Sequence, residues 1–183
     1  WQATGATSPA VEVTPAQAHR QVHLVAKADA PQSELRVGHP SVTRAHPDFH
    51  ALSVMNAILG GLFNSRINPN LRERHAYTYG AFSQFDWRRR ASAFEAATAV
   101  RSDVTAAAVR EILHEIDRMR NEPVSASELS LAVDYLTGVF PIRFETSAAI
   151  AAALAMREGY ELAPDYYDAY RERIAAVTVD EVL

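Results

Sequence analysis

Histidines are the first residues to test for chemistry, because two of them four residues apart on a helix can bind zinc when a third ligand comes from elsewhere. His46 and His50 have this spacing, but Pro47 lies between them at an expected helix start, where His46 is better explained as a cap-region residue. His114 and the glutamate after it begin an H-E-x-x-H motif, yet Arg118 stands where the second histidine is needed. The inverted motif H-x-x-E-H is absent from the sequence. We therefore expect this chain to bind no metal and to perform no zinc hydrolysis alone.

Other catalytic chemistries lack their residues as well. The sequence has no cysteine and no G-x-S-x-G elbow, which excludes a thiol nucleophile and an exposed serine of the hydrolase type. Gly60 and Gly61 are followed by no G-K-[ST], so we interpret them as the end of a helix rather than a phosphate loop. The acids Asp165, Asp168 and Glu172 are expected on a solvated helix face, and residues 88–90, three arginines, at a hairpin tip.

Composition limits the partners further. The 183 residues carry 18 Lys+Arg and 22 Asp+Glu, a net charge of −4, which disfavours nucleic-acid binding. No apolar run reaches the 18 residues that a membrane span needs. The length suits one domain, which we place at residues 16–183 after an irregular lead-in at 1–15. The chain begins with Trp1 rather than Met, which indicates a fragment or a processed product.

The elements expected up to residue 101 are four strands and one helix. Alternating apolar residues predict strands at 21–26 and 34–38. A helix is expected from Asp48 to the two glycines, followed by a polar turn at 64–70. Tyr77, Tyr79 and residues 81–85 are interpreted as strand, because aromatic residues at period two fit a pleated surface. The alanines of residues 91–101 fit a helix, but the position of this segment between the three arginines and a helix cap favours a further strand.

The second half is expected to be helical. An apolar stripe predicts a helix at 103–121, with Glu115 among the residues on its wet side. Ser125 and Glu128 form a capping-box pattern for a helix that reaches about Val139. Alanine-rich residues 146–157 predict a closely packed helix, and another is expected from Pro164 to about 176. Thr178 and Glu181 repeat the capping pattern. The fold class predicted is α+β, a mixed and mostly antiparallel sheet packed against several helices.

One segment carries a longer pattern. Residues 56–80 read N-x-x-L-G-G-x-F-x-S-R-x-x-x-x-L-R-E-x-x-x-x-T-Y-G, and residues 123–132 read P-V-S-x-x-E-L-x-x-A. Together with residues 144–146 and 174–182, these ordered blocks resemble the C-terminal half of pitrilysin/insulinase-type zinc metallopeptidases. The resemblance runs from about residue 16 to the end of the chain.

The resemblance implies a fold and a function. In that family two similar domains face each other as a clamshell, one with the zinc motif H-x-x-E-H and one without it. The domain without zinc supplies an arginine and a tyrosine seven residues apart, and Arg72 and Tyr79 stand at those positions. This chain therefore resembles the non-catalytic, substrate-binding domain, which is not expected to be active alone. Its partner would be a zinc-bearing homologous domain or subunit, its substrate a peptide, and its last strand would follow Leu183.

Some points differ from the family pattern or stay open. Ala76 replaces the usual glycine between the arginine and the tyrosine, and Tyr77 replaces an aliphatic residue, so Tyr77 ranks below Tyr79 as a substrate contact. The alternative function is a scaffold or assembly subunit of this family without peptidase activity. Alanine and arginine richness indicates a high-GC bacterial source, for which we expect the periplasm rather than the cytoplasm.

Overall fold

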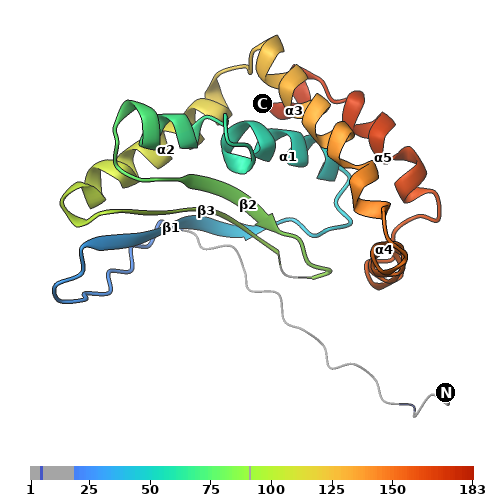
Figure 1. Ribbon diagram of the computed structural model, residues 1–183, viewed down its shortest axis with the longest axis horizontal. Coiled ribbons are helices and arrows are strands. Elements are labelled where there is room, and N and C mark those ends of the chain that lie inside the picture. The colour runs from blue at the N-terminus through green and yellow to red at the C-terminus, as the bar shows by residue number, and fades with distance from the viewer. Residues whose placement is uncertain (1–4, 6–18, 91) are drawn as a thin grey trace.

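A three-stranded antiparallel sheet forms one layer of the molecule, shown in Figure 1. The computed structural model describes residues 5, 19–90 and 92–183. The strand order is β1-β3-β2, with β1 at Gln32–Ser41, β2 at Ala81–Asp86 and β3 at Ser92–Arg101. The register aligns Leu35 of β1 and Ala81 of β2 with Thr98 of the central strand. Expected strands at 34–38 and 91–101 are thus confirmed.

Helices form the second layer over one face of this sheet. In Figure 1, α1 and α2 lie above the strands, α3 and α5 lie next to α1 beyond the sheet, and α4 lies farther out at the lower right. In chain order the helices are α1 (Phe49–Asn56), η1 (Ala57–Gly61), η2 (Pro69–Arg74), η3 (Ser102–Val104), α2 (Thr105–Asn121), α3 (Ala126–Val139), η4 (Pro141–Phe144), α4 (Ser147–Gly159), α5 (Tyr166–Ala175) and α6 (Val179–Val182). The predicted α+β class is confirmed.

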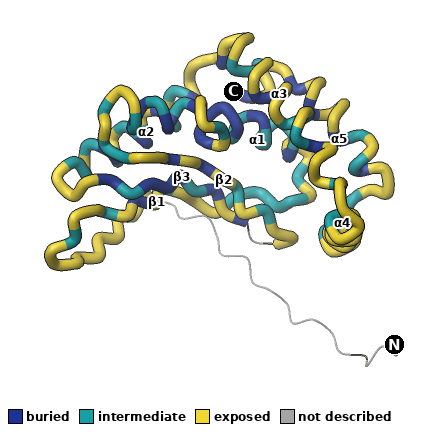
Figure 2. Tube along the Cα trace, in the orientation of Figure 1, coloured by how far each residue is buried: buried dark blue, intermediate teal, exposed yellow. Residues whose placement is uncertain are grey.

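The core lies between the two layers, where Figure 2 shows buried stretches of α1, α2 and β3. Its side chains come from every second residue of β3 and from the inner faces of the helices. The most deeply buried apolar side chains are Val54, Leu59, Ile67, Leu71, Val100, Ile112 and Ile174. Burial of such side chains contributes about 1.5–3 kcal/mol each to folding.

Capping boxes mark two helix starts where the sequence predicted them. The Ser125 hydroxyl accepts from the Glu128 amide and the Glu128 carboxylate accepts from the Ser125 amide, so both groups are satisfied at the start of α3. Thr178 and Glu181 do the same for α6. These local patterns work because each needs only residues three apart.

Two strand expectations in the first half were wrong. Residues 21–26 form no strand, and Val22, Leu24 and Val25 are 87–89% exposed, because no neighbouring strand pairs with them in the described part of the chain. Tyr77 and Tyr79 precede the strand, which begins at Ala81.

The region around the two glycines also differs. Gly60 and Gly61 are inside the π-helical turn η1 instead of capping a helix, and Leu62 after them is extended. The polar turn expected at 64–70 continues into a second π-helical turn, η2. A Cβ on Gly60 would lie 2.4 Å from the Ser83 backbone nitrogen, so this glycine allows η1 to approach β2.

Two expectations in the second half were also wrong. Glu115 is only 1% exposed, because Asn70 and Arg118 bind its carboxylate within the protein. The alanine-rich helix α4 forms as expected, but its short side chains leave it loosely covered, with no buried residue and Ile150, Leu154 and Met156 all exposed.

Within residues 5, 19–90 and 92–183, no single helix is long and apolar enough to cross a membrane; α3 with η4 and α4 pass that test only as a pair bent by 111°. The predicted lead-in at 1–15 falls outside the described residues, apart from Gly5.

Candidate functional site

Arg72 lies on η2, the short helical turn between the glycine pair and the sheet. Its guanidinium carbon is 4.8 Å from the centre of the Phe63 ring, a cation–π contact. Arg72 makes no hydrogen bond or ion pair with any residue that the structure describes. Its hydrogen-bond donors are therefore free for a bound group, while the Phe63 ring restricts where the guanidinium lies.

A buried polar cluster anchors η2 to helix α2. The Asn70 amide donates to the Glu115 carboxylate at 2.6 Å and to Glu111 at 3.2 Å. Arg118 donates to the same Glu115 carboxylate at 2.9 Å, which compensates the charge of that buried side chain. Because a buried carboxylate that loses a hydrogen bond is costly, the bonds from Asn70 fix η2 on α2 and with it the base of Arg72.

Tyr79 lies on the loop at residues 75–80 that joins η2 to β2, and 93% of it is exposed. Hydroxyl groups hold the backbone on both sides of it. Thr78 donates to the Ala99 carbonyl at 2.7 Å, and Thr98 donates to the Gly80 carbonyl at 2.8 Å. The loop backbone is thus tied to β3 while the phenol of Tyr79 projects into solvent.

Ala76 lies in the same loop with φ at +51°, in the left-handed region. This region disfavours residues with a Cβ, which explains why a glycine suits this position. The Tyr77 ring stacks on His75 with ring centres 5.0 Å apart, and Tyr77 is half-buried. Tyr77 therefore packs against the protein, whereas Tyr79 does not.

Asn68 links the segments that carry the two predicted residues. Its amide nitrogen donates to the Phe63 carbonyl at 2.8 Å, and its oxygen accepts from the Ala81 amide at 3.0 Å. The side chain is buried, with the residue 4% exposed. One amide therefore holds the loop beneath Arg72 and the start of β2 after Tyr79. Arg72 and Tyr79 themselves share no hydrogen bond or ring contact in the described structure.

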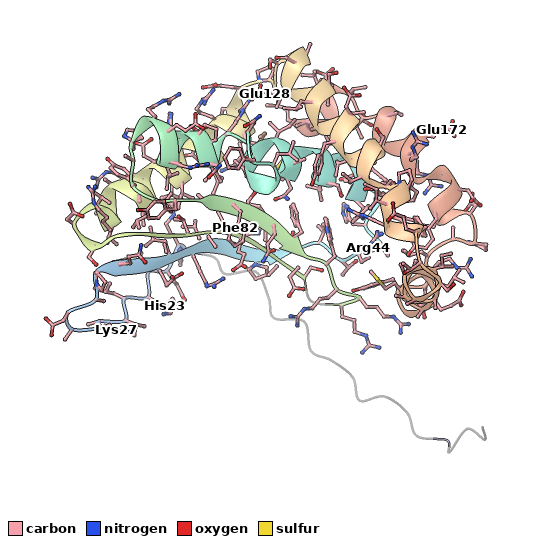
Figure 3. The ribbon with its side chains drawn as sticks, in the orientation of Figure 1. His23, Lys27, Arg44, Phe82, Glu128 and Glu172 are labelled. Atoms are coloured by element: carbon pink, nitrogen blue, oxygen red, sulfur yellow. The ribbon has the colours of Figure 1, made fainter. Side chains whose placement is uncertain are left out.

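A bidentate ion pair secures the same region to α3. Arg66 donates to the two carboxylate oxygens of Glu128 at 2.7 and 3.1 Å. Hydrogen bonding by Arg66 is the main reason that the pKa of Glu128 is lowered to about 2. Glu128 lies at the first turn of α3, as Figure 3 shows, so the pair joins the S-R part of the long motif to the capping box. Its role is structural.

The histidines do not fit a zinc site. His46 accepts a hydrogen bond from the Asp48 amide at 3.2 Å, and His50 packs among the rings of Phe49, Tyr166 and Tyr170. Among the residues described, no group of three or more His, Asp or Glu side chains converges as metal ligands would.

Two residues of this site, Phe63 and Asn68, were not predicted from the sequence. Phe63 belongs to the long motif, but nothing in its spacing predicts that its ring would lie under Arg72. Asn68 stood in an expected polar turn, and the only signal was an asparagine beside a proline, which usually marks a turn.

A model of the peptidase M16 inactive-domain family matches residues 1–136. Among solved structures, the chain is similar to the peptidase M16 inactive domain from Pseudomonas fluorescens, with 24% identity and a TM-score of 0.78 over 84% of this chain and 37% of that one. It is also similar to an inactive peptidase domain from Bordetella parapertussis, with 14% identity and a TM-score of 0.73 over 87% and 86%.

A third similar structure is the periplasmic protease PqqL from Escherichia coli, with 14% identity and a TM-score of 0.69 over 84% of this chain and 17% of that one. No curated protein sequence matches this chain. The chain spans less than two fifths of the length of the Pseudomonas and Escherichia proteins, and all three likenesses concern the fold.

Proposed function

Because this chain belongs to the peptidase M16 inactive-domain family, we propose that it holds the peptide substrate for a zinc-bearing catalytic domain. The observation that carries the proposal is the free donor set of Arg72 and Tyr79, on two segments fixed by Asn68. The family resemblance assigns substrate contact to these same two positions.

The chemistry asked of the two side chains is hydrogen bonding to the substrate. A guanidinium offers several N–H donors in a fixed plane, and a phenol offers one O–H. Either can hold a peptide carbonyl and stabilise the negative charge that its oxygen develops during hydrolysis. In this proposal the partner domain's zinc supplies the activated water, and this chain supplies binding and orientation.

The partner is proposed to be a homologous domain or subunit with the H-x-x-E-H motif, facing this one across a chamber. The compartment proposed is a bacterial periplasm, in line with the Escherichia coli protease of similar fold. Examination of the same gene and its neighbours for H-x-x-E-H tests the partner directly. If neither the gene nor its neighbours encode that motif, the scaffold function is favoured instead.

The kinetic test uses the enzyme assembled from this chain and its zinc-bearing partner. Arg72→Ala and Tyr79→Phe should each lower kcat for peptide cleavage by about 100–1000-fold, the usual effect of losing one donor to the developing oxyanion. Arg74→Ala, an exposed arginine on the same turn, and Tyr77→Phe are the matched controls and should leave kcat unchanged.

Comparing kcat and KM of each variant with those of the wild type shows how the side chain contributes to binding. A higher KM with unchanged kcat would mean that the side chain contributes equally to ground-state and transition-state binding. Full activity in both Arg72→Ala and Tyr79→Phe would contradict the assigned role.

A further inference from the structure

A cavity of about 740 Å³ lies at the N-terminal end of α1, and the proposed function makes no use of it. It opens between the start of α1, the loop from α4 to α5 and the C-terminal end of α5. Figure 3 shows Arg44 in this region, between the sheet and helices α4 and α5. Its wall includes Arg44, Phe49, His50, Tyr166 and Arg173.

Arg44 is held in the cavity wall by aromatic rings. Its guanidinium carbon is 3.6 Å from the centre of the Phe49 ring and 4.7 Å from that of Tyr166, and it donates to the Tyr166 hydroxyl. No carboxylate pairs with Arg44 in the described part of the chain. Stacking therefore orients a charged fork whose remaining donors have no counter-ion.

Arg173 supplies a second cation. It lines the same cavity from α5 and has no ion pair or hydrogen bond with the residues described. Both arginines are close enough to His50 to disfavour its protonation.

His50 completes the set. Its Nε2 atom is buried and has no hydrogen-bond partner among the residues described. Burial, and after it the charges of Arg173 and Arg44, lower the pKa of His50 to about 4. Its ring is therefore neutral at pH 7, with two charged arginines close to it.

Three carboxylates also line the cavity, and none of them forms an ion pair with Arg44 or Arg173 among the described residues. Glu161 pairs with Arg89, Glu181 accepts from Thr178 in the α6 capping box, and Asp48 lies 3.7 Å from the ring of His46. The guanidinium groups of the two arginines are thus without an ion pair beside aromatic walls. This is the donor chemistry that recognises carboxylate and phosphate oxygens.

We propose that this cavity binds a small oxyanion of the carboxylate or phosphate type, with Arg44 and Arg173 as charged donors beside the His50 ring. The proposal is independent of the substrate-holding role. A bound anion would oppose the effect of the two arginines on His50, which also faces Tyr166 and Tyr170. It would therefore raise the His50 pKa, a change specific to this site.

The test is a titration of the 183-residue chain with inorganic phosphate and, separately, with acetate, followed by the NMR signals of the His50 ring. We expect saturable 1:1 shifts and a raised His50 pKa at saturation. Arg173→Ala should weaken binding at least about tenfold, equivalent to about 1.4 kcal/mol. Arg171→Ala removes an arginine of the same helix that does not line the cavity, and should bind like the wild type.

Arg44→Lys is a milder variant that keeps the positive charge, so it is expected to preserve the fold while removing the planar guanidinium. It should lower the affinity for the anion less than Arg173→Ala does. A peptide with a free C-terminus, compared with its amidated form, identifies the source of the anion. Tighter binding of the free peptide than of acetate indicates a peptide terminus, and equal binding indicates a small free anion. Unsaturable shifts with both anions, or equal affinity in Arg173→Ala and wild type, would overturn the proposal.

Discussion

Replacing Gly60 and Gly138 with alanine tests how closely η1 packs against β2, because an added Cβ meets neighbouring atoms at Gly60 and none at Gly138. A Cβ at Gly60 would lie 2.4 Å from the Ser83 backbone nitrogen, 2.5 Å from its Oγ and 2.8 Å from its Cβ. The Ser83 hydroxyl can rotate away, but the backbone nitrogen belongs to β2, which pairs with β3 along its length. Gly60→Ala must therefore separate η1 from the sheet.

The expected cost is at the upper end of the range for overpacking, about 3 kcal/mol. For a domain of this size, each kcal/mol shifts Tm by about 2–4 °C, so Gly60→Ala should lower Tm by about 6–12 °C. Gly138 is inside α3, and a Cβ there meets no atom within 4 Å. Gly138→Ala should instead stabilise the protein by up to about 1 kcal/mol through helix propensity.

Thermal unfolding followed by circular dichroism measures both effects. A Tm for Gly60→Ala within 2 °C of wild type, a margin set by the roughly 2–4 °C expected per kcal/mol, would refute the close approach of η1 to β2. A loss of stability in Gly138→Ala would show that its surroundings are not open.

Two further changes test the loop and the ion pair. Ala76→Gly should raise the free energy of unfolding by about 1 kcal/mol, because the left-handed backbone strains alanine; a decrease in a urea titration would contradict this. Glu128→Gln should destabilise the fold by about 2–4 kcal/mol at pH 7, because it removes the counter-ion of Arg66, whose side chain is only 7% exposed. The control Glu122→Gln changes an exposed carboxylate and should cost under about 1 kcal/mol. Folding lowers the pKa of Glu128 from 4.5 to about 2, so the stability that the ion pair contributes is complete above about pH 4.5 and is lost as the pH falls toward 2. The urea midpoints of the wild type and Glu128→Gln should therefore converge over that range. A constant difference between them from pH 7 to pH 2 would argue against the pair.

Local patterns predicted the elements whose cause is itself local. The capping boxes of α3 and α6 depend on residues three apart. The strand at 91–101 was instead predicted from its position between three arginines and a helix start, because its alanines fit a helix as well. The strand expected at 21–26 failed because alternation cannot supply a neighbouring strand. Glu115 was misplaced because its partner Asn70 is 45 residues away in the sequence.

For the candidate site too, some residues were predicted from the sequence and others depend on contacts between distant segments. Resemblance indicated Arg72 and Tyr79 by their spacing, and the structure gives one of them a ring contact and the other an exposed position. The bonds of Asn68 to Phe63 and Ala81 depend on three segments meeting, which no spacing expresses. The cavity beside His50 likewise needs helices that are more than 100 residues apart.

Photo-cross-linking from position 79 tests the proposed substrate contact most directly. Benzoylphenylalanine replaces Tyr79 in the complex with the zinc-bearing partner, and a slowly cleaved peptide is irradiated in its presence. The control places the same group at Tyr135, which is 49% exposed on α3. We predict cross-linking to the peptide from position 79, competed by unlabelled substrate, and none from position 135. Absence of a competed cross-link at position 79, or equal yields from both positions, would contradict the substrate-holding role.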